Sequence, residues 1–147
     1  MNEAAVGDLA PRSRLRIAGL LAAVIGLGLA SRRWPLPGVF AEHTGDALYA
    51  TAAYCAFALL APAVRSRALG AAALLFAFAI EALQLLTWPW LQQLRASRIG
   101  ALLLGQGFLW ADLVAYAIGV GLACVADVTF LRRSIPPAVR PDRLGRP

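Results

Sequence analysis

The chain is poor in the residues that usually build catalytic and metal centres. It has one histidine and two cysteines, and we find no His-x-x-x-His or Glu-x-x-His spacing, no Gly-x-Ser-x-Gly turn and no phosphate-binding glycine loop. Cys55 and Cys124 lie in apolar stretches without a neighbouring histidine or thiol, so they predict neither a metal set nor a disulfide framework. We therefore expect no cofactor and no metal. Catalysis is unsupported rather than excluded, since two acids and an arginine can transfer protons or bind a phosphate through a cation.

Lysine is absent, and charged residues are scarce outside short clusters. All 14 basic residues are arginine, a bias that GC-rich bacterial coding explains as well as any need for guanidinium chemistry. Sixty per cent of the 147 residues are hydrophobic, more than one small soluble core can bury. The arginines flank apolar runs, where they orient helices and meet anionic head groups, so the net charge of +6 indicates a lipid bilayer and no nucleic acid.

Four long apolar runs fill the middle of the chain. They occupy roughly residues 17–31, 47–64, 68–90 and 113–131, against the about 20 residues that a helix needs to cross a bilayer. We predict an all-α membrane protein with four transmembrane helices. Their expected bounds are about 15–33, 47–64, 68–90 and 112–131.

The ends of the chain are predicted to be cytoplasmic tails around a membrane domain of residues 15–131. The first tail is 1–14, and the second, 132–147, is rich in proline and arginine and is expected to be disordered. A cleaved secretory signal is an alternative reading of the first run. Small residues four apart in that run favour a transmembrane helix instead.

The arginines also orient the helices. If the four helices alternate in direction, ten arginines fall on one side and only Arg32, Arg33, Arg95 and Arg98 on the other. The positive-inside rule then places both termini in the cytoplasm of a multi-pass protein of the bacterial inner membrane. The long connection at about 91–111 contains an apolar stretch too short to cross, which predicts a re-entrant or interfacial segment, with a plain surface loop as the alternative.

A carboxylate well inside the third apolar run is the strongest sign of a polar site. Glu81 is followed one turn later by Gln84, and a charge at that depth costs roughly 2.5 to 3.5 kcal/mol on insertion scales. Asp46 and Asp112 open the second and fourth helices on the same outer side, although each is alternatively a charge that stabilises a helix N-terminus. Arg95 is the expected partner of Glu81, because a guanidinium binds a carboxylate through two parallel hydrogen bonds.

Helical spacing and the outer loops complete the candidate ligand-binding site. Tyr116 shares a stripe of the fourth helix with Asp112, and Arg32 lies in the first outer loop. Asp127, next to Arg132 and Arg133, reads as an interfacial charge. The predicted ligand-binding residues are Asp46, Glu81, Gln84, Arg95, Asp112, Tyr116 and Arg32.

Several short motifs occur in an order that resembles a known family. They are Gly28-Leu29-Ala30-Ser31-Arg32, Gly45-Asp46-Ala47-Leu48-Tyr49, Ile80-Glu81-Ala82-Leu83-Gln84 with Trp90 and Arg95, and Leu104-Gly105-x-Gly107-Phe108-x-Trp110-x-Asp112-Leu113-x-Ala115-Tyr116-x-x-Gly119. Over about residues 15–125 this order resembles the bacterial domain-of-unknown-function family catalogued as 2809. An acid opening one helix, then Glu-x-x-Gln, then Asp-x-x-x-Tyr-x-x-Gly is more distantly similar to VanZ-like membrane proteins, some of them associated with glycopeptide resistance.

The resemblance implies a four-helix membrane fold without an established activity, and it transfers no reaction. The chain departs from the family at two positions. It has Ala101 where relatives often carry a histidine, and Tyr49 where they often carry tryptophan. A mechanism that uses that histidine as a proton carrier is therefore in doubt for this chain.

Three functions remain open at the level of sequence. The first is an outer-leaflet pocket that recognises a polar or lipid-linked component of the cell envelope. The second is a proton-coupled transporter or channel subunit that uses Glu81 and Asp112, which requires a homo-oligomer to enclose a pathway. The third is an assembly partner that docks other membrane proteins through alanine and glycine stripes. An enzymatic role ranks below these three.

Overall fold

The computed structural model describes residues 12–34, 37–105 and 109–131, which form helices joined by short connections, with no strand among them. The prediction of an all-α chain is confirmed. The four long helices are α1 (Arg14–Arg33), α2 (Val39–Leu60), α3 (Ser66–Gln84) and α6 (Trp110–Ala126), the last continued by a π-helical turn, Asp127–Leu131. Two short helices, α4 (Pro89–Ala96) and α5 (Arg98–Leu104), connect α3 to α6.

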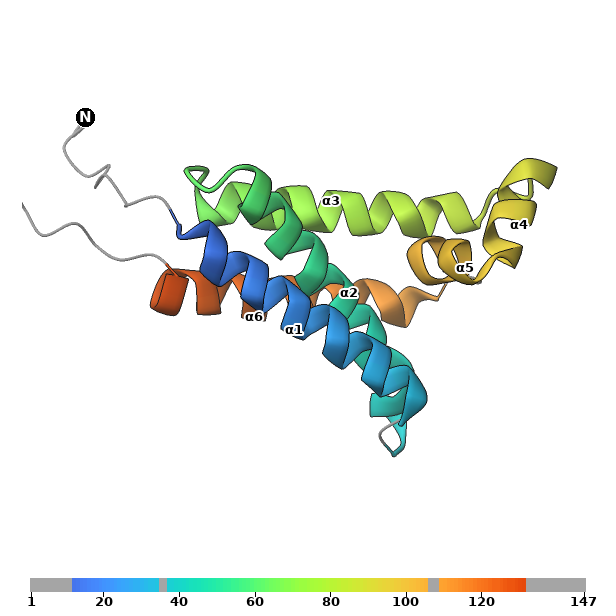
Figure 1. The fold of residues 1–147 in the computed structure, drawn as a ribbon. Helices are drawn as coiled ribbons and strands as arrows, with labels where there is room; N and C mark the ends of the chain where they lie inside the picture. Colours follow the sequence, from blue (N-terminus) through green and yellow to red (C-terminus); the bar gives the residue numbers. More distant parts are fainter. Residues whose placement is uncertain (1–11, 35–36, 106–108, 132–147) are drawn as a thin grey trace, which may run out of the picture.

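The long helices form a bundle in which α2 occupies the central position and contacts α1, α3 and α6 (Figure 1). The start of α1, the α2–α3 connection and the end of α6 meet at one end of the bundle, which we call the Asp127 end. The helices α4 and α5 lie at the other end, beside the end of α3 and the start of α6. We call this the Glu81 end.

Small residues allow α2 and α6 to approach closely. A Cβ atom at Gly119 of α6 would lie 2.1 Å from the carbonyl oxygen of Ala47 in α2, so only glycine fits this crossing. The Thr51 hydroxyl lies 2.9 Å from the same Ala47 oxygen and 3.0 Å from the Gly119 oxygen, bridging the two backbones. The core around this contact consists largely of alanine with Tyr54 and Tyr116.

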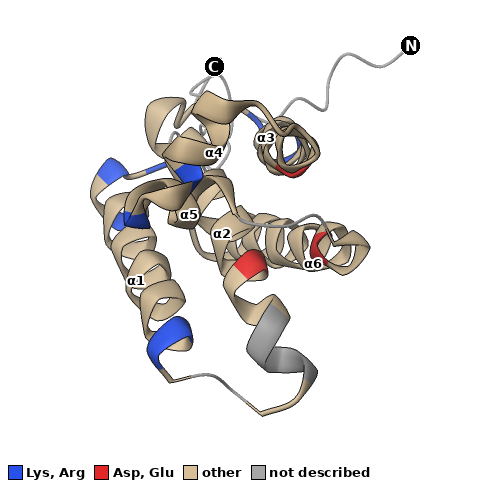
Figure 2. Cartoon of the chain, turned by 90° about the vertical axis from the view of Figure 1, so that its right-hand side faces the viewer, with Lys and Arg blue, Asp and Glu red and all other residues tan. Residues whose placement is uncertain are grey.

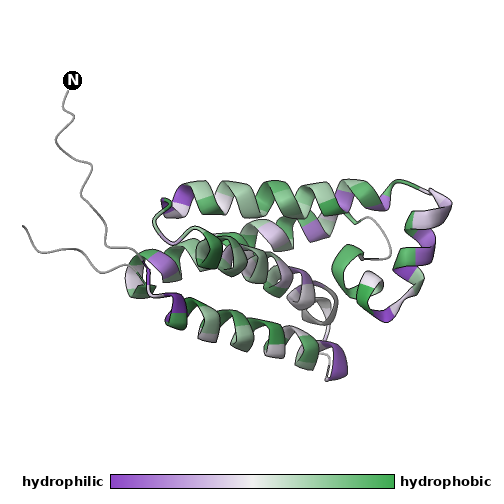
Figure 3. Ribbon diagram, turned by 45° about the horizontal axis from the view of Figure 1, so that its top comes forward, coloured by the Kyte–Doolittle hydropathy of each residue, from purple (hydrophilic) through white to green (hydrophobic). Residues whose placement is uncertain are grey.

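The outside of the bundle is apolar. Large hydrophobic side chains such as Leu60, Leu75, Leu122 and Phe130 are exposed, and hydrophilic residues gather towards the helix ends and on α4 (Figure 3). Three helices of the described residues are long and apolar enough to span a membrane, Arg14–Arg33, Ser66–Gln84 and Trp110–Leu131. An apolar exterior of this extent is typical of a protein surrounded by lipid.

The prediction of four spanning helices is wrong on this criterion, because α2 does not qualify. Its first half carries His43, Thr44 and Asp46, which lower its hydropathy. The central position of α2 explains this composition, since three neighbouring helices cover it with protein. The small residues of the first helix were expected to pack against neighbouring helices. In the structure Ala18, Ala22 and Gly26 are exposed on the outside of α1 instead.

Helix boundaries differ from the predicted ones at two places. The second helix begins at Val39 instead of at 47, and the third ends at Gln84 instead of at 90. Pro89 cannot continue α3 and opens α4 at its first turn. The predicted re-entrant or interfacial segment is two short helices instead of an irregular loop, separated at Ser97, whose hydroxyl accepts a hydrogen bond from the Gly100 N–H at 3.0 Å.

Candidate functional site

Glu81 lies in the last turn of α3 and is buried, with 1% of its surface exposed. Three groups donate hydrogen bonds to its carboxylate: Gln84 Nε2 at 2.9 Å, the Tyr116 hydroxyl at 2.9 Å and the Leu109 N–H at 3.1 Å. Leu109 precedes the first turn of α6, where the helix dipole also favours a negative charge. The buried carboxylate is thus satisfied by protein groups and fixes the side chains of Gln84 and Tyr116.

Arg95 occupies a different place from the one expected. Its guanidinium donates to the carbonyl oxygens of Leu83 at 2.5 Å and Leu86 at 3.2 Å, so it binds the C-terminal end of α3. The ion pairs of the described residues do not include the expected Glu81–Arg95 pair. The reason is that α3 ends at Gln84 and exposes its last carbonyl groups, which α4 covers by folding back.

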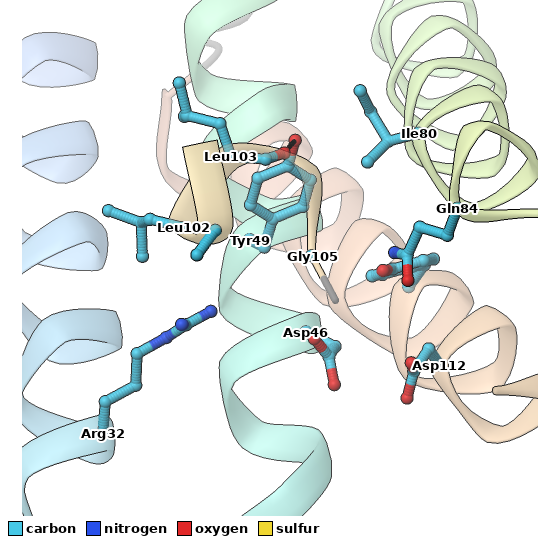
Figure 4. A pocket seen from close by; sticks show the side chains of 11 residues that line it. Arg32, Asp46, Tyr49, Ile80, Gln84, Leu102, Leu103, Gly105 and Asp112 are labelled. Atoms are coloured by element: carbon cyan, nitrogen blue, oxygen red, sulfur yellow. Dashed lines mark hydrogen bonds between the residues drawn. The ribbon is translucent and has the colours of Figure 1, made fainter. Parts of the chain in front are cut away.

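A cavity of about 300 Å³ lies beside the buried glutamate, between α2, α3, α5 and α6 (Figure 4). Its apolar wall is formed by Ala101, Leu102 and Leu103 of α5. The Tyr49 hydroxyl donates to the Leu103 carbonyl oxygen at 2.9 Å and thereby holds α5 against α2. The polar side chains that line the cavity are Arg32, Asp46, Tyr49, Gln84, Asp112 and Tyr116.

Gly105 shapes the cavity where α5 ends. Its φ angle of +67° lies in the left-handed region, and a Cβ atom there would lie 2.5 Å from Gln84 Nε2. Glycine thus lets the chain turn while it passes close to Gln84. The Oε1 atom of Gln84 is buried and has no hydrogen-bond partner among the described residues, so it offers an acceptor beside the cavity.

The acids of α2 and α6 meet on one side of the cavity. Asp46, Asp112 and His43 each place a ligand atom within 4.8 Å of the others, and His43 Nδ1 lies 3.4 Å from Asp112 Oδ1. That separation satisfies an ion-pair distance but not hydrogen-bond geometry. Arg32 faces the acids across the cavity from α1 (Figure 4), and acidic positions of α2, α3 and α6 lie at this end of the bundle (Figure 2).

The opposite end of the bundle contains a polar cluster that the sequence reading missed. Asp127 is fully buried, and Arg12 binds its two carboxylate oxygens through Nε at 2.6 Å and Nη2 at 2.5 Å. The hydroxyls of Tyr54 and Ser66 donate to Asp127 Oδ2 at 2.7 and 2.6 Å. Asp127 is therefore not an interfacial charge, and Arg12 is not part of a free tail.

A signal for this cluster was present in the sequence. Asp127 follows Ala123 by four residues and so extends the stripe of Asp112, Tyr116 and Gly119 along α6. Arg132 and Arg133, the neighbours that the sequence suggests for Asp127, lie outside the described residues. The structure thus brings Asp46, Gln84, Asp112, Tyr116 and Arg32 to one cavity, with Glu81 directly behind it, and places Arg95 on the end of α3.

Residues 35–120 match a family described as protein of unknown function (DUF2809). The matched region runs from before α2 into α6 and includes the cavity acids and Glu81, but it excludes Arg12, Arg32 and Asp127. The more distant similarity to VanZ-like proteins remains a prediction. No solved structure matches the chain.

Proposed function

The chain belongs to the DUF2809 family of unknown function, and we propose that it is a membrane protein whose cavity at the Glu81 end binds the polar head group of a lipid or lipid-linked envelope component. In this proposal it is a multi-pass protein of the bacterial inner membrane in which α2 also crosses, covered by its neighbouring helices instead of by lipid. The four crossings then leave both termini in the cytoplasm. The Glu81 end then lies towards the outer leaflet. The distribution of arginines supports this orientation.

One observation carries the proposal: charges of both signs face one small cavity at the Glu81 end of the bundle. Arg32 lines one side of the cavity, and Asp46 and Asp112 line the other. A volume of about 300 Å³ is at the small end of ligand sites and suits a head group better than a whole lipid. The guanidinium suits a phosphate, and the carboxylates suit an amine, hydroxyl groups or a cation.

The buried Glu81 carboxylate holds two of the side chains that line the cavity. Its donors are protein groups, so Glu81 acts as a positioning residue for Gln84 and Tyr116, which line the cavity. The free Oε1 atom of Gln84 supplies an acceptor for a ligand. This arrangement favours binding over a proton pathway, because three protein groups occupy the Glu81 carboxylate and Glu81 itself does not line the cavity.

The test is lipid retention by the purified protein. We expect native mass spectrometry of the detergent-purified chain to show one bound phospholipid, with phosphatidylethanolamine and phosphatidylglycerol added as zwitterionic and anionic probes. Arg32→Gln should reduce retention at least fivefold, because it removes the cation facing the acids. Arg33→Gln is the matched control, since Arg33 is exposed on the same turn and does not line the cavity. Equal retention in both variants overturns the proposal.

A further inference from the structure

We propose that His43, Asp46 and Asp112 bind a divalent first-row transition metal ion, with Zn²⁺ as the expected occupant. The three side chains come from the facing helices α2 and α6, and one ligand atom of each lies within 4.8 Å of the others. The inference deepens the proposed function, because Asp46 and Asp112 also line the cavity. Metal binding itself does not depend on whether the cavity binds a lipid.

The geometry of the three residues fits a small coordination sphere. In a four-coordinate zinc site with bonds of about 2.1 Å, neighbouring ligand atoms are about 3.4 Å apart. His43 Nδ1 and Asp112 Oδ1 are 3.4 Å apart. His43 and Asp46 are three residues apart on α2 and share one face of it, so a small rotation of the Asp46 carboxylate completes the set.

The hydrogen bonding of His43 supplies an independent argument. His43 Nδ1 is buried and has no hydrogen-bond partner among the described residues, although its side chain is 30% exposed overall. A buried nitrogen without a partner is destabilising, and so are two neighbouring carboxylates with no cation between them. A divalent cation bound by all three removes both costs at once.

The ligand types select the kind of metal. An imidazole nitrogen favours zinc and other first-row transition metals over magnesium and calcium, and carboxylates complete sets of this kind for Zn²⁺ and Mn²⁺. The residues come from two helices at positions 43, 46 and 112, which is why a search for short histidine motifs does not find them. The His-x-x-Asp spacing on α2 is the local part of the pattern.

Three protein ligands leave a coordination position open, as in zinc sites that bind a further molecule. Asp46 and Asp112 line the cavity that Arg32 faces from the other side. A phosphate with one oxygen on the metal and others on the Arg32 guanidinium satisfies both charges. The same chemistry suits inorganic phosphate and the phosphate of a lipid head group.

The experiment uses the full chain, purified in detergent, stripped with a chelator and titrated with ZnCl₂ or MnCl₂ without added lipid. We expect one Zn²⁺ per chain by elemental analysis and calorimetry, and intense visible absorption of the Co²⁺-loaded protein, as a four-coordinate site produces. His43→Ala, Asp46→Asn and Asp112→Asn should each weaken zinc binding at least tenfold. Phosphate and phosphatidylethanolamine are then added separately to the loaded protein, and a change in the Co²⁺ spectrum shows which one reaches the open position.

The controls separate this site from adventitious binding and from unfolding. A variant with Cys55→Ala and Cys124→Ser removes both thiols and should still bind one Zn²⁺. The melting temperature of each ligand variant is also measured with and without zinc. A variant that melts at the parent's zinc-free temperature, and whose melting temperature zinc does not raise, is folded but has lost the site. Absence of stoichiometric zinc in the parent chain, or equal binding by the ligand variants, overturns the inference. If the stripped protein retains lipid but binds no zinc, only this inference is overturned. If it binds zinc but retains no lipid, only the proposed function is overturned.

Discussion

Arg12 and Asp127 form a bidentate ion pair across 115 residues of sequence, with both side chains fully buried. The pair joins the segment that precedes α1 to the π-helical turn that follows α6. The same guanidinium donates to the carbonyl oxygens of Pro62 at 2.9 Å and Val64 at 2.7 Å, so it also holds the α2–α3 connection. One arginine thus ties together three chain segments at the Asp127 end.

Removing one partner of this pair should destabilise the bundle. Arg12→Gln leaves the Asp127 carboxylate buried without its cation, and breaking such a pair costs about 3–5 kcal/mol. The free energy of unfolding, measured in detergent by denaturant titration, should fall by that amount. Arg14→Gln is the control, because Arg14 is exposed at the start of α1 and its loss should change stability by less than about 0.5 kcal/mol. Equal effects of the two substitutions contradict the prediction.

The crossing of α2 and α6 should tolerate no side chain at position 119. Gly119→Ala places a Cβ atom 2.1 Å from the Ala47 carbonyl oxygen, so the helices must move apart, at a typical cost of about 1–3 kcal/mol. Gly121→Ala is the matched control on the same helix, because nothing lies within 4 Å of its Cβ position. The higher helix propensity of alanine should leave that variant as stable as the parent or slightly more stable. Thermal melting of both variants measures the difference.

Sequence periodicity was sufficient for the helical class and for most of the long helices, because each apolar run has helical length. It failed for α2, where the start at Val39 and the central position depend on contacts with three other helices. A residue such as His43 lowers the hydropathy of α2 without exposing the helix to lipid. Hydropathy along a stretch of sequence cannot show that other helices cover α2, because those helices come from distant parts of the chain.

Helix alternation predicts that Asp46 and Asp112 share one side, and in the structure a carboxylate oxygen of each lies within 4.8 Å of the other. The prediction that Arg95 is the partner of Glu81 was wrong. It relied on the short distance between them in the sequence, but α3 ends at Gln84 and Arg95 binds its last carbonyl groups instead. The Arg12–Asp127 pair could not be predicted either, since the two residues are 115 positions apart in the sequence. The pattern could therefore place residues such as Asp46 and Asp112 at the same end of the bundle, but it could not show which groups bind each other there.

Glu81 should be needed for the order of its neighbours. Glu81→Gln replaces one carboxylate oxygen by an amide nitrogen, which cannot accept a hydrogen bond. In the place of Oε2 it deprives the Tyr116 hydroxyl and Gln84 Nε2 of their acceptor, and in the place of Oε1 it deprives the Leu109 N–H; each unsatisfied buried group costs about 1–3 kcal/mol. Tyr116→Phe removes a donor and leaves the carboxylate with two others, so its stability loss should be smaller. Denaturant titration in detergent should therefore rank the parent above Tyr116→Phe and Tyr116→Phe above Glu81→Gln. The reverse order of the two variants contradicts this hydrogen-bond assignment.

A charge swap between Glu81 and Arg95 should not restore stability. If the two formed an ion pair, Glu81→Arg combined with Arg95→Glu would recover much of what each substitution loses alone. Arg95 instead binds the carbonyl oxygens of Leu83 and Leu86, and a glutamate there would repel them. The losses of the two single substitutions should therefore add to within about 0.5 kcal/mol, as they do for residues without a shared contact. The positive comparison is Glu81→Gln with Tyr116→Phe, whose losses should be less than additive because both substitutions change the hydrogen bond between these two side chains. Recovery in the charge swap would show that Glu81 and Arg95 meet after all.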